Sequence, residues 1–150
     1  MQSENIPLTV HPLEQRGLLH CQIQVPQRAE ALHVFNVHLD LRSKNRRKQA
    51  SKIIAHAQHK VPAHAPLILG GDFNDWGREA SPLFHQSLQL QESFKHSTGK
   101  YSRSFPNFMP FFELDRLYSR HMQIHSVQTL SVAPWTKLSD HLPILVEFEI

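Results

Sequence analysis

The stretch that decides the fold is PLILGGDFNDW, residues 66–76. Its apolar run over residues 67–69 is typical of a short strand that is buried on both faces. The two glycines that follow allow a sharp turn or a close approach of the backbone, which a Cβ atom would hinder. Asp72 and Asn74 then emerge past the carboxyl end of the strand, where open α/β sheets usually bind their ligands. An acidic turn after a core strand explains this segment equally well, so the rest of the chain has to decide.

Length and composition indicate one ordinary globular domain. The chain has 150 residues, of which 40% are hydrophobic and 19% charged. A formal net charge of +3 permits a phosphate-bearing substrate without requiring one, and no basic tail points by itself to nucleic acid. Cys21 is the only cysteine, which excludes a disulfide framework and fits a reducing compartment. Because neither a signal peptide nor an apolar run of roughly 20 residues is present, we expect a cytoplasmic protein without a membrane span.

Hydrophobic periodicity predicts a mixture of strands and helices after an irregular lead-in over residues 1–15. In the first strand, residues 17–25, the alternation places Leu19, Cys21 and Ile23 on the buried face. Residues 94–112 lack a period and contain two prolines, which indicates a long surface loop. The other predicted elements are strands over 31–39, 66–69, 114–118, 124–132 and 144–150, a helix from the N-cap Ser43 to just before Pro62, and a helix from Ser81 to about Leu88.

Several side chains in these elements have a structural and a functional interpretation. The aromatic residues of the 94–112 loop more often pin such a loop to the core than line a substrate groove. Arg46 and its basic neighbours fit a solvated helix face, with a phosphate-facing patch, in which Arg46 binds substrate, as the alternative. His56, His59 and His64 have no acidic residue nearby in the sequence, so we interpret them as surface residues.

Four polar clusters lie where a strand ends or begins. Hard cations such as Mg²⁺ prefer carboxylate and amide oxygens, and phosphodiester hydrolysis needs a base for water and positive charge at the phosphoryl oxygens. Each cluster alone is weak evidence, but together and in this order they are specific. The clusters are Asn36-Val37-His38-Leu39, Gly71-Asp72-Phe73-Asn74, Leu114-Asp115-Arg116-Leu117-Tyr118 and Ser139-Asp140-His141-Leu142-Pro143.

This order of motifs closely resembles the endonuclease/exonuclease/phosphatase superfamily, whose fold is that of pancreatic deoxyribonuclease. The accessory residues, among them Arg46 and Gln49, are similar to those of its compact bacterial members. The resemblance runs from about Glu14 to the C-terminus. It implies an α+β chain that forms one partial domain, the C-terminal part of the four-layer α/β/β/α sandwich of the deoxyribonuclease-I-like fold.

For the metal and the attacking water, the resemblance implies roles for three side chains. Asp72 would orient or deprotonate the water, and Asn74 would hold that water, the phosphate or the metal. Asp140 would be a metal ligand, directly or through water. The implied cofactor is Mg²⁺ or Mn²⁺, with Asp140, Asp72 and Asn74 as its protein ligands.

For the phosphate, the resemblance implies roles for three further residues. His38 would contact the scissile phosphate and stabilise its developing charge. Asp115 would accept a hydrogen bond from His141 and orient it toward the phosphoryl oxygens. The residue types agree with these roles, because an ionised carboxylate only accepts hydrogen bonds and so suits an imidazole N–H.

The chain also departs from the family pattern. Two site residues that the family carries in its N-terminal half, an asparagine after the first strand and a metal-binding glutamate, have no counterpart here. We therefore expect the C-terminal part of a family member, with weakened metal affinity. We also expect an exposed apolar sheet face that favours self-association.

Three hypotheses for function follow from these patterns. The first is a Mg²⁺-dependent phosphoesterase whose substrate is a phosphate ester, with nucleic acid, inositol phosphates and phospholipid head groups all open. The second is a catalytically impaired, truncated remnant that binds phosphate-bearing ligands or a protein partner. The third is a histidine-rich zinc hydrolase, which predicts tight stoichiometric zinc binding.

Overall fold

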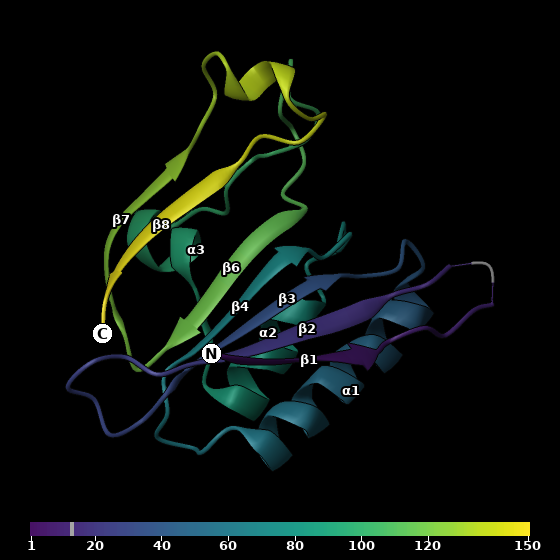
Figure 1. Cartoon of the computed structure of the whole chain (residues 1–150). Coiled ribbons are helices and arrows are strands. Elements are labelled where there is room, and N and C mark those ends of the chain that lie inside the picture. Colours follow the sequence, from purple (N-terminus) through teal and green to yellow (C-terminus); the bar gives the residue numbers. More distant parts are fainter. Residues whose placement is uncertain (13) are drawn as a thin grey trace.

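The computed structural model describes residues 1–12 and 14–150 and has the α+β composition expected from the sequence (Figure 1). No helix within these residues has the length and apolar character needed to cross a membrane. The strands are β1 (Gln2–Pro7), β2 (Gly17–Ile23), β3 (Leu32–His38), β4 (Leu67–Asp72), β5 (Gln91–Glu92), β6 (Asp115–Arg120), β7 (Gln123–Thr129) and β8 (Ile144–Glu149). The α-helices are α1 (Ser43–Lys60), α2 (Ala80–Leu88) and α3 (Ser93–Thr98), and a short 3₁₀ helix spans Trp135–Lys137.

A six-stranded sheet in the order β1-β2-β3-β4-β6-β5 organises the molecule. β3 and β4 are parallel and joined by α1, which confirms the predicted strand–helix–strand unit, while the other neighbours in this sheet are antiparallel. β7 and β8 form a separate antiparallel pair beside β6 and α3 (Figure 1). Most of these pairings join strands that follow one another along the chain, and the β4–β6 pair, which passes over β5, is the exception.

The core lies between the six-stranded sheet and the helices α1 and α2, which cover one of its faces (Figure 1). From the strands it takes fully buried side chains such as Leu18, Phe35 and Leu69, and from the helices Ile53 and Phe84. The spacing of the apolar residues in α1 produces this packing, because residues three or four apart share one helix face.

Two predictions for the N-terminal part were wrong. Residues 2–7, expected to be irregular, form β1, the polar edge strand of the sheet. Edge strands tolerate polar sequences because only one of their sides is paired, so hydrophobic periodicity does not reveal them. In β2 the buried face is also the opposite one: Leu18 and His20 face the helices, whereas Leu19 is 42% exposed.

The 94–112 segment is more ordered than a surface loop, because it begins with helix α3. The Glu92 carboxylate caps this helix by accepting a hydrogen bond from the Lys95 backbone N–H at 2.7 Å. Several aromatic residues of the segment do not pin it to the core. Phe108, Phe111 and Phe112 are 80%, 52% and 42% exposed.

Candidate active site

Strand register brings three of the predicted site residues to one edge of the sheet. In the parallel pair β3–β4, His38 lies opposite Asp72, and in the antiparallel pair β4–β6, Asp72 lies opposite Asp115. The three side chains come from three adjacent strands at the same height. His38 Nε2 lies 3.4 Å from Asp72 Oδ2, and the His38 side chain is more than half exposed, whereas that of Asp72 is mostly covered.

The glycine before Asp72 is what allows β4 to run beside β3 up to this edge. A Cβ atom at Gly71, whose φ is +138°, would lie 1.9 Å from the backbone oxygen of Val37. Gly70 has no such requirement, since a Cβ there would meet nothing closer than 3.7 Å. The strand thus continues through both glycines instead of turning at them, and only Gly71 is there for close approach.

His141 joins the site from the segment that precedes β8. Its Nδ1 donates to Asp115 Oδ2 at 2.7 Å, as the sequence predicted for this pair. The Ser104 hydroxyl donates to the same oxygen at 2.5 Å, and the ring of Phe105 lies 4.7 Å from that of His141. Asp72, Asp115 and His141 each present a ligand-type atom within 4.8 Å of the others. Because Nδ1 is hydrogen-bonded to Asp115, Nε2 is the nitrogen of His141 that can interact with a ligand.

The electrostatics of this cluster suit acid–base chemistry. Burial raises the pKa of the Asp72 carboxyl above its ordinary value; the Asn74 N–H bond opposes this rise and the charge of Asp115 adds to it. Burial lowers the pKa of His141, but the hydrogen bond to Asp115 and the surrounding carboxylate charges outweigh it and leave the pKa raised. The site therefore pairs a carboxylate that binds protons more readily than usual with an imidazole that holds its charge more readily than usual.

Asn74 is held rigidly next to Asp72. Its backbone has φ of +46°, a left-handed conformation that asparagine tolerates, and its N–H donates to Asp72 Oδ1 at 2.8 Å. Its side-chain nitrogen donates to the Leu39 carbonyl at 3.0 Å. The amide oxygen is the atom of this side chain that remains for water, phosphate or metal.

A buried ion pair beneath the site was missed by sequence reasoning. Asp75 and Arg116 are each 1% exposed, and Arg116 Nη1 donates to Asp75 Oδ2 at 2.9 Å. Asp75 also accepts hydrogen bonds from the N–H groups of Glu79 and Ala80, at the start of α2. The pair thus fixes the loop after β4 to both β6 and α2. The sequence gives little sign of this pair. Asp75 follows Asn74 and Arg116 follows Asp115, so each is easily taken for a mere neighbour of a site residue.

Asp140 is exposed and is not part of the group formed by Asp72, Asp115 and His141. The segment that carries it is fixed by Asn107, whose backbone N–H donates to the Asp140 carbonyl at 2.8 Å. The side-chain nitrogen of Asn107 donates to the carbonyls of Thr136 and Ser139 at 2.9 and 2.6 Å. The backbone and side-chain hydrogen bonds of Asn107 thus fasten the Asp140–His141 segment to the 94–112 segment. The metal role of Asp140 stays a prediction.

The structure corrects the interpretation of Arg46. This side chain is buried rather than on a solvated helix face, and its guanidinium donates to the Leu41 carbonyl at 2.6 Å and lies 3.8 Å from Asp75. A guanidinium enclosed in this way is not free to bind substrate, so the predicted substrate contact disagrees with its position. Its role is structural: from the first turn of α1, the guanidinium holds the backbone of the turn between β3 and α1.

A continuous aromatic surface borders His141. From Phe105, which contacts His141, it passes to Phe112 at a ring distance of 6.3 Å and on to Trp76 at 4.5 Å. Trp76 is 48% exposed and Phe112 42%. Flat, partly exposed rings beside this cluster are suited to stacking with planar groups of a ligand.

Comparisons with known proteins bear on the fold. No protein-family model matches the chain. The Escherichia coli (strain K12) protein YbhP, described as uncharacterized, is 34% identical to it over 147 residues, an alignment that covers 98% of this chain and 58% of YbhP. The chain thus spans less than two thirds of the length of this relative.

Solved structures share the fold. An endonuclease/exonuclease/phosphatase from Bacteroides vulgatus superposes with a TM-score of 0.82 at 18% identity, over 100% of this chain and 65% of that one. TDP2 from D. rerio, complexed with a single-strand DNA product, superposes with a TM-score of 0.75 at 18% identity, over 100% of this chain and 68% of that one.

Proposed function

The chain has the deoxyribonuclease-I-like fold of the endonuclease/exonuclease/phosphatase superfamily, and from this premise we propose that it hydrolyses a phosphate ester with the help of a divalent metal ion. The single observation that carries the proposal is the convergence of four side chains: Asp72, Asp115 and His141 present ligand-type atoms within 4.8 Å of one another, and His38 lies 3.4 Å from Asp72. This set contains the base and the cationic groups that such a reaction needs.

In the proposed mechanism, Asp72 removes a proton from the water molecule that attacks the phosphorus atom of the ester. Its raised pKa makes this carboxylate a better proton acceptor than an ordinary aspartate, and it is anchored on one oxygen by the Asn74 N–H. Protonated His141, oriented by Asp115, donates to a phosphoryl oxygen on which negative charge develops, and His38, beside Asp72, contacts the same phosphate group.

The oxygen donors at the site fit a hard cation. Asp72 contributes a carboxylate, Asn74 an amide oxygen whose nitrogen is already engaged, and Asp140 an exposed carboxylate on the neighbouring segment. Mg²⁺ commonly binds through only one or two carboxylates plus water and substrate phosphate. When bound there, the ion would withdraw charge from a phosphoryl oxygen. We therefore assign Asp72, Asn74 and Asp140 as the residues that would hold Mg²⁺ or Mn²⁺.

The test is hydrolysis of bis(4-nitrophenyl) phosphate and of 4-nitrophenyl phosphate by the metal-depleted chain, before and after Mg²⁺ is added. Asp72→Asn and His141→Ala are expected to lower kcat/KM by about 10²–10⁴-fold, the usual contribution of acid–base groups. His125→Ala, which removes an exposed histidine paired with Glu149, is the matched control and should retain full activity. Equal rates for the unaltered chain and Asp72→Asn would refute the proposal.

The aromatic surface beside His141 favours substrates with planar groups. If it contributes to binding, a short single-stranded oligonucleotide should be cleaved with a lower KM than the nitrophenyl ester, and Trp76→Ala should raise that KM. Should hydrolysis be absent while the oligonucleotide still binds, the second hypothesis, a phosphate-ligand-binding module, would replace the first.

A further inference from the structure

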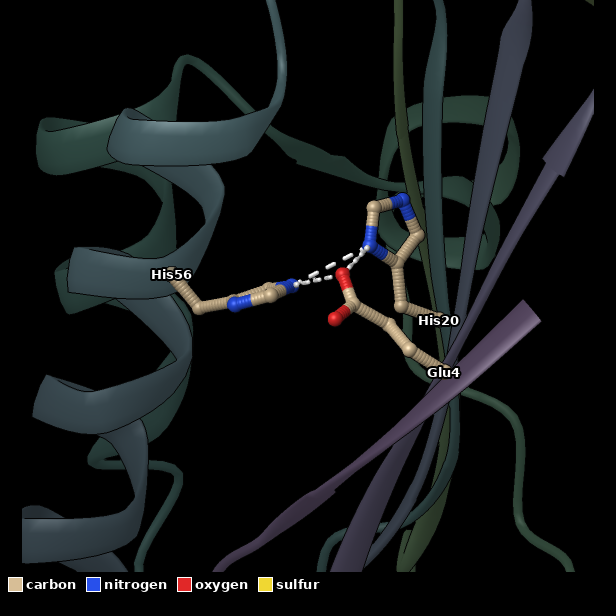
Figure 2. A group of neighbouring side chains, drawn as sticks. All are labelled: Glu4, His20 and His56. Atoms are coloured by element: carbon tan, nitrogen blue, oxygen red, sulfur yellow. Dashed lines mark hydrogen bonds and ion pairs between the residues drawn. The ribbon is translucent and has the colours of Figure 1, made fainter. Parts of the chain in front are cut away.

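Three side chains with metal-ligating atoms meet on the helix-covered face of the sheet, away from the candidate active site. Glu4 comes from β1, His20 from β2 and His56 from α1, and Figure 2 shows the three side chains pointing toward one another. His33, which adjoins His20, lies five residues before His38 on β3, a span of about 17 Å. The Glu4–His20–His56 cluster is therefore separate from the phosphate-type site.

The backbone explains why these residues meet. Glu4 and His20 are directly paired across β1 and β2, so their side chains project from the same face of the sheet. His56 lies three residues after the buried Ile53 and hence on the helix face that packs on the sheet. The expectation that His56 is a surface residue without an acidic neighbour was wrong: its side chain is 12% exposed and lies 3.6 Å from Glu4 Oε1.

The separations of the three atoms are those of ligands around one ion. His20 Nδ1 lies 3.1 Å from His56 Nε2 and 3.2 Å from Glu4 Oε1, and the third side of the triangle is 3.6 Å. Ligands about 2.0–2.1 Å from a tetrahedral zinc ion stand about 3.3 Å apart. No rearrangement of strands or helix is needed to reach that geometry.

The surroundings of His20 complete the arrangement. Its other nitrogen, Nε2, lies 2.9 Å from His33 Nδ1, so Nε2–H donates to His33 when Nδ1 serves as a ligand. A ring nitrogen of each histidine is aimed at Glu4: His20 Nδ1 lies 3.2 Å and His56 Nε2 3.6 Å from Glu4 Oε1. Lys60 is the nearby positive charge that opposes a cation, and Glu4 supplies the compensating negative charge.

We propose that Glu4, His20 and His56 bind one zinc ion, or a similar divalent transition metal that prefers imidazole ligands. Two histidines and one glutamate form a ligand set that zinc proteins use with an open fourth position. A cavity of about 330 Å³ adjoins two of the three residues, Glu4 and His20, and is otherwise lined by Gln2, Ser3, Gln22 and Lys60. Imidazole nitrogen suits zinc and not Mg²⁺, so the site has a different metal preference from the phosphate-type site. Bound zinc would fasten the edge strand β1 to α1.

The test is calorimetric titration of zinc chloride into the metal-depleted chain carrying His141→Ala, which removes the other ligand cluster. The expected result is one zinc ion per chain. Adding His56→Ala should weaken binding by more than about tenfold, because loss of even a hydrogen-bond partner of a metal ligand typically costs about 10–100-fold. Adding His59→Ala, an exposed histidine on the same helix, is the matched control and should leave the affinity unchanged.

A second variant guards against a folding defect in His56→Ala. Glu4→Gln alters a half-exposed side chain on the edge strand and should also weaken zinc binding, with an unchanged melting temperature in the absence of metal. Cobalt bound in place of zinc should give the intense visible absorption of a tetrahedral site, and excess Mg²⁺ should not displace it. Absence of stoichiometric zinc binding, or equal affinities of the His56→Ala and His59→Ala chains, would overturn the proposal.

Discussion

Replacing Asp115 by asparagine preserves the shape of the side chain but removes its negative charge. That charge orients the imidazole of His141 and favours its protonated form. The bond to be weakened is 2.7 Å long, and both side chains are at least three-quarters buried. A hydrogen bond to a charged group contributes about 1.5–3 kcal/mol. If this stabilisation is fully needed in the transition state, Asp115→Asn lowers kcat/KM by about 10- to 150-fold.

The same substitution has a signature in pH. Because Asp115 raises the pKa of His141, the descending limb of the activity profile should move to lower pH in Asp115→Asn. The free energy of unfolding should also depend on pH through His141. A histidine whose pKa is raised by folding stabilises the folded state below its unfolded pKa of about 6.5, and this contribution is lost as the pH rises through the folded value. The melting temperatures of the two proteins should thus differ most in mild acid.

The measurement is kcat/KM for bis(4-nitrophenyl) phosphate with Mg²⁺ across neutral pH, together with melting temperatures at each pH. Glu149→Gln is the matched control, because it breaks an exposed carboxylate–histidine pair, 3.1 Å from His125, that lies outside the site. An activity within about twofold of the unaltered chain, combined with an unmoved descending limb, would refute the role assigned to Asp115.

Three further substitutions test the scaffold. Gly71→Ala should lower the free energy of unfolding by more than about 3 kcal/mol, because its Cβ would meet a backbone oxygen at 1.9 Å, whereas Gly70→Ala should leave the urea midpoint nearly unchanged; equal midpoints would contradict this. Asp75→Asn leaves a buried guanidinium without its charged partner and should cost about 3–5 kcal/mol, while Glu79→Gln, in an exposed ion pair, serves as the control in the same urea titration. Leu19→Lys should reduce concentration-dependent self-association, measured by light scattering, since Leu19 is 42% exposed on the uncovered sheet face. If the unaltered chain and the variant are both monomeric, this sheet face does not mediate self-association.

The sequence was sufficient where local patterns determine structure. The strand–helix–strand unit around α1, the helix after Asp75 and the alternation of β8 all follow from periodicity and are present. The contact of Asp115 with His141 was anticipated through the family resemblance of the motifs, and the strand register that sets Asp72 opposite Asp115 is consistent with the same set of site residues.

The sequence was insufficient where partners lie far apart along the chain. His20 reads as the polar side of β2, yet it is buried because His33, His56 and Phe35 surround it. Arg46 reads as a surface charge, yet carbonyl groups at the end of β3 enclose it. A polar residue whose hydrogen bonds come from other elements carries no local mark of burial, and this is why both were misplaced.

The bonds of Asn107 have a consequence for selectivity. Because the backbone and side chain of Asn107 hold the loop before β8, a ligand that displaced the 94–112 segment would also move the backbone next to His141. Under the proposed function, recognition of a distal part of the substrate would then be coupled to the alignment of the His141 imidazole. Ligands that do not engage the aromatic rings would meet a less well-aligned histidine, so discrimination between substrates would be expressed in turnover as well as in affinity.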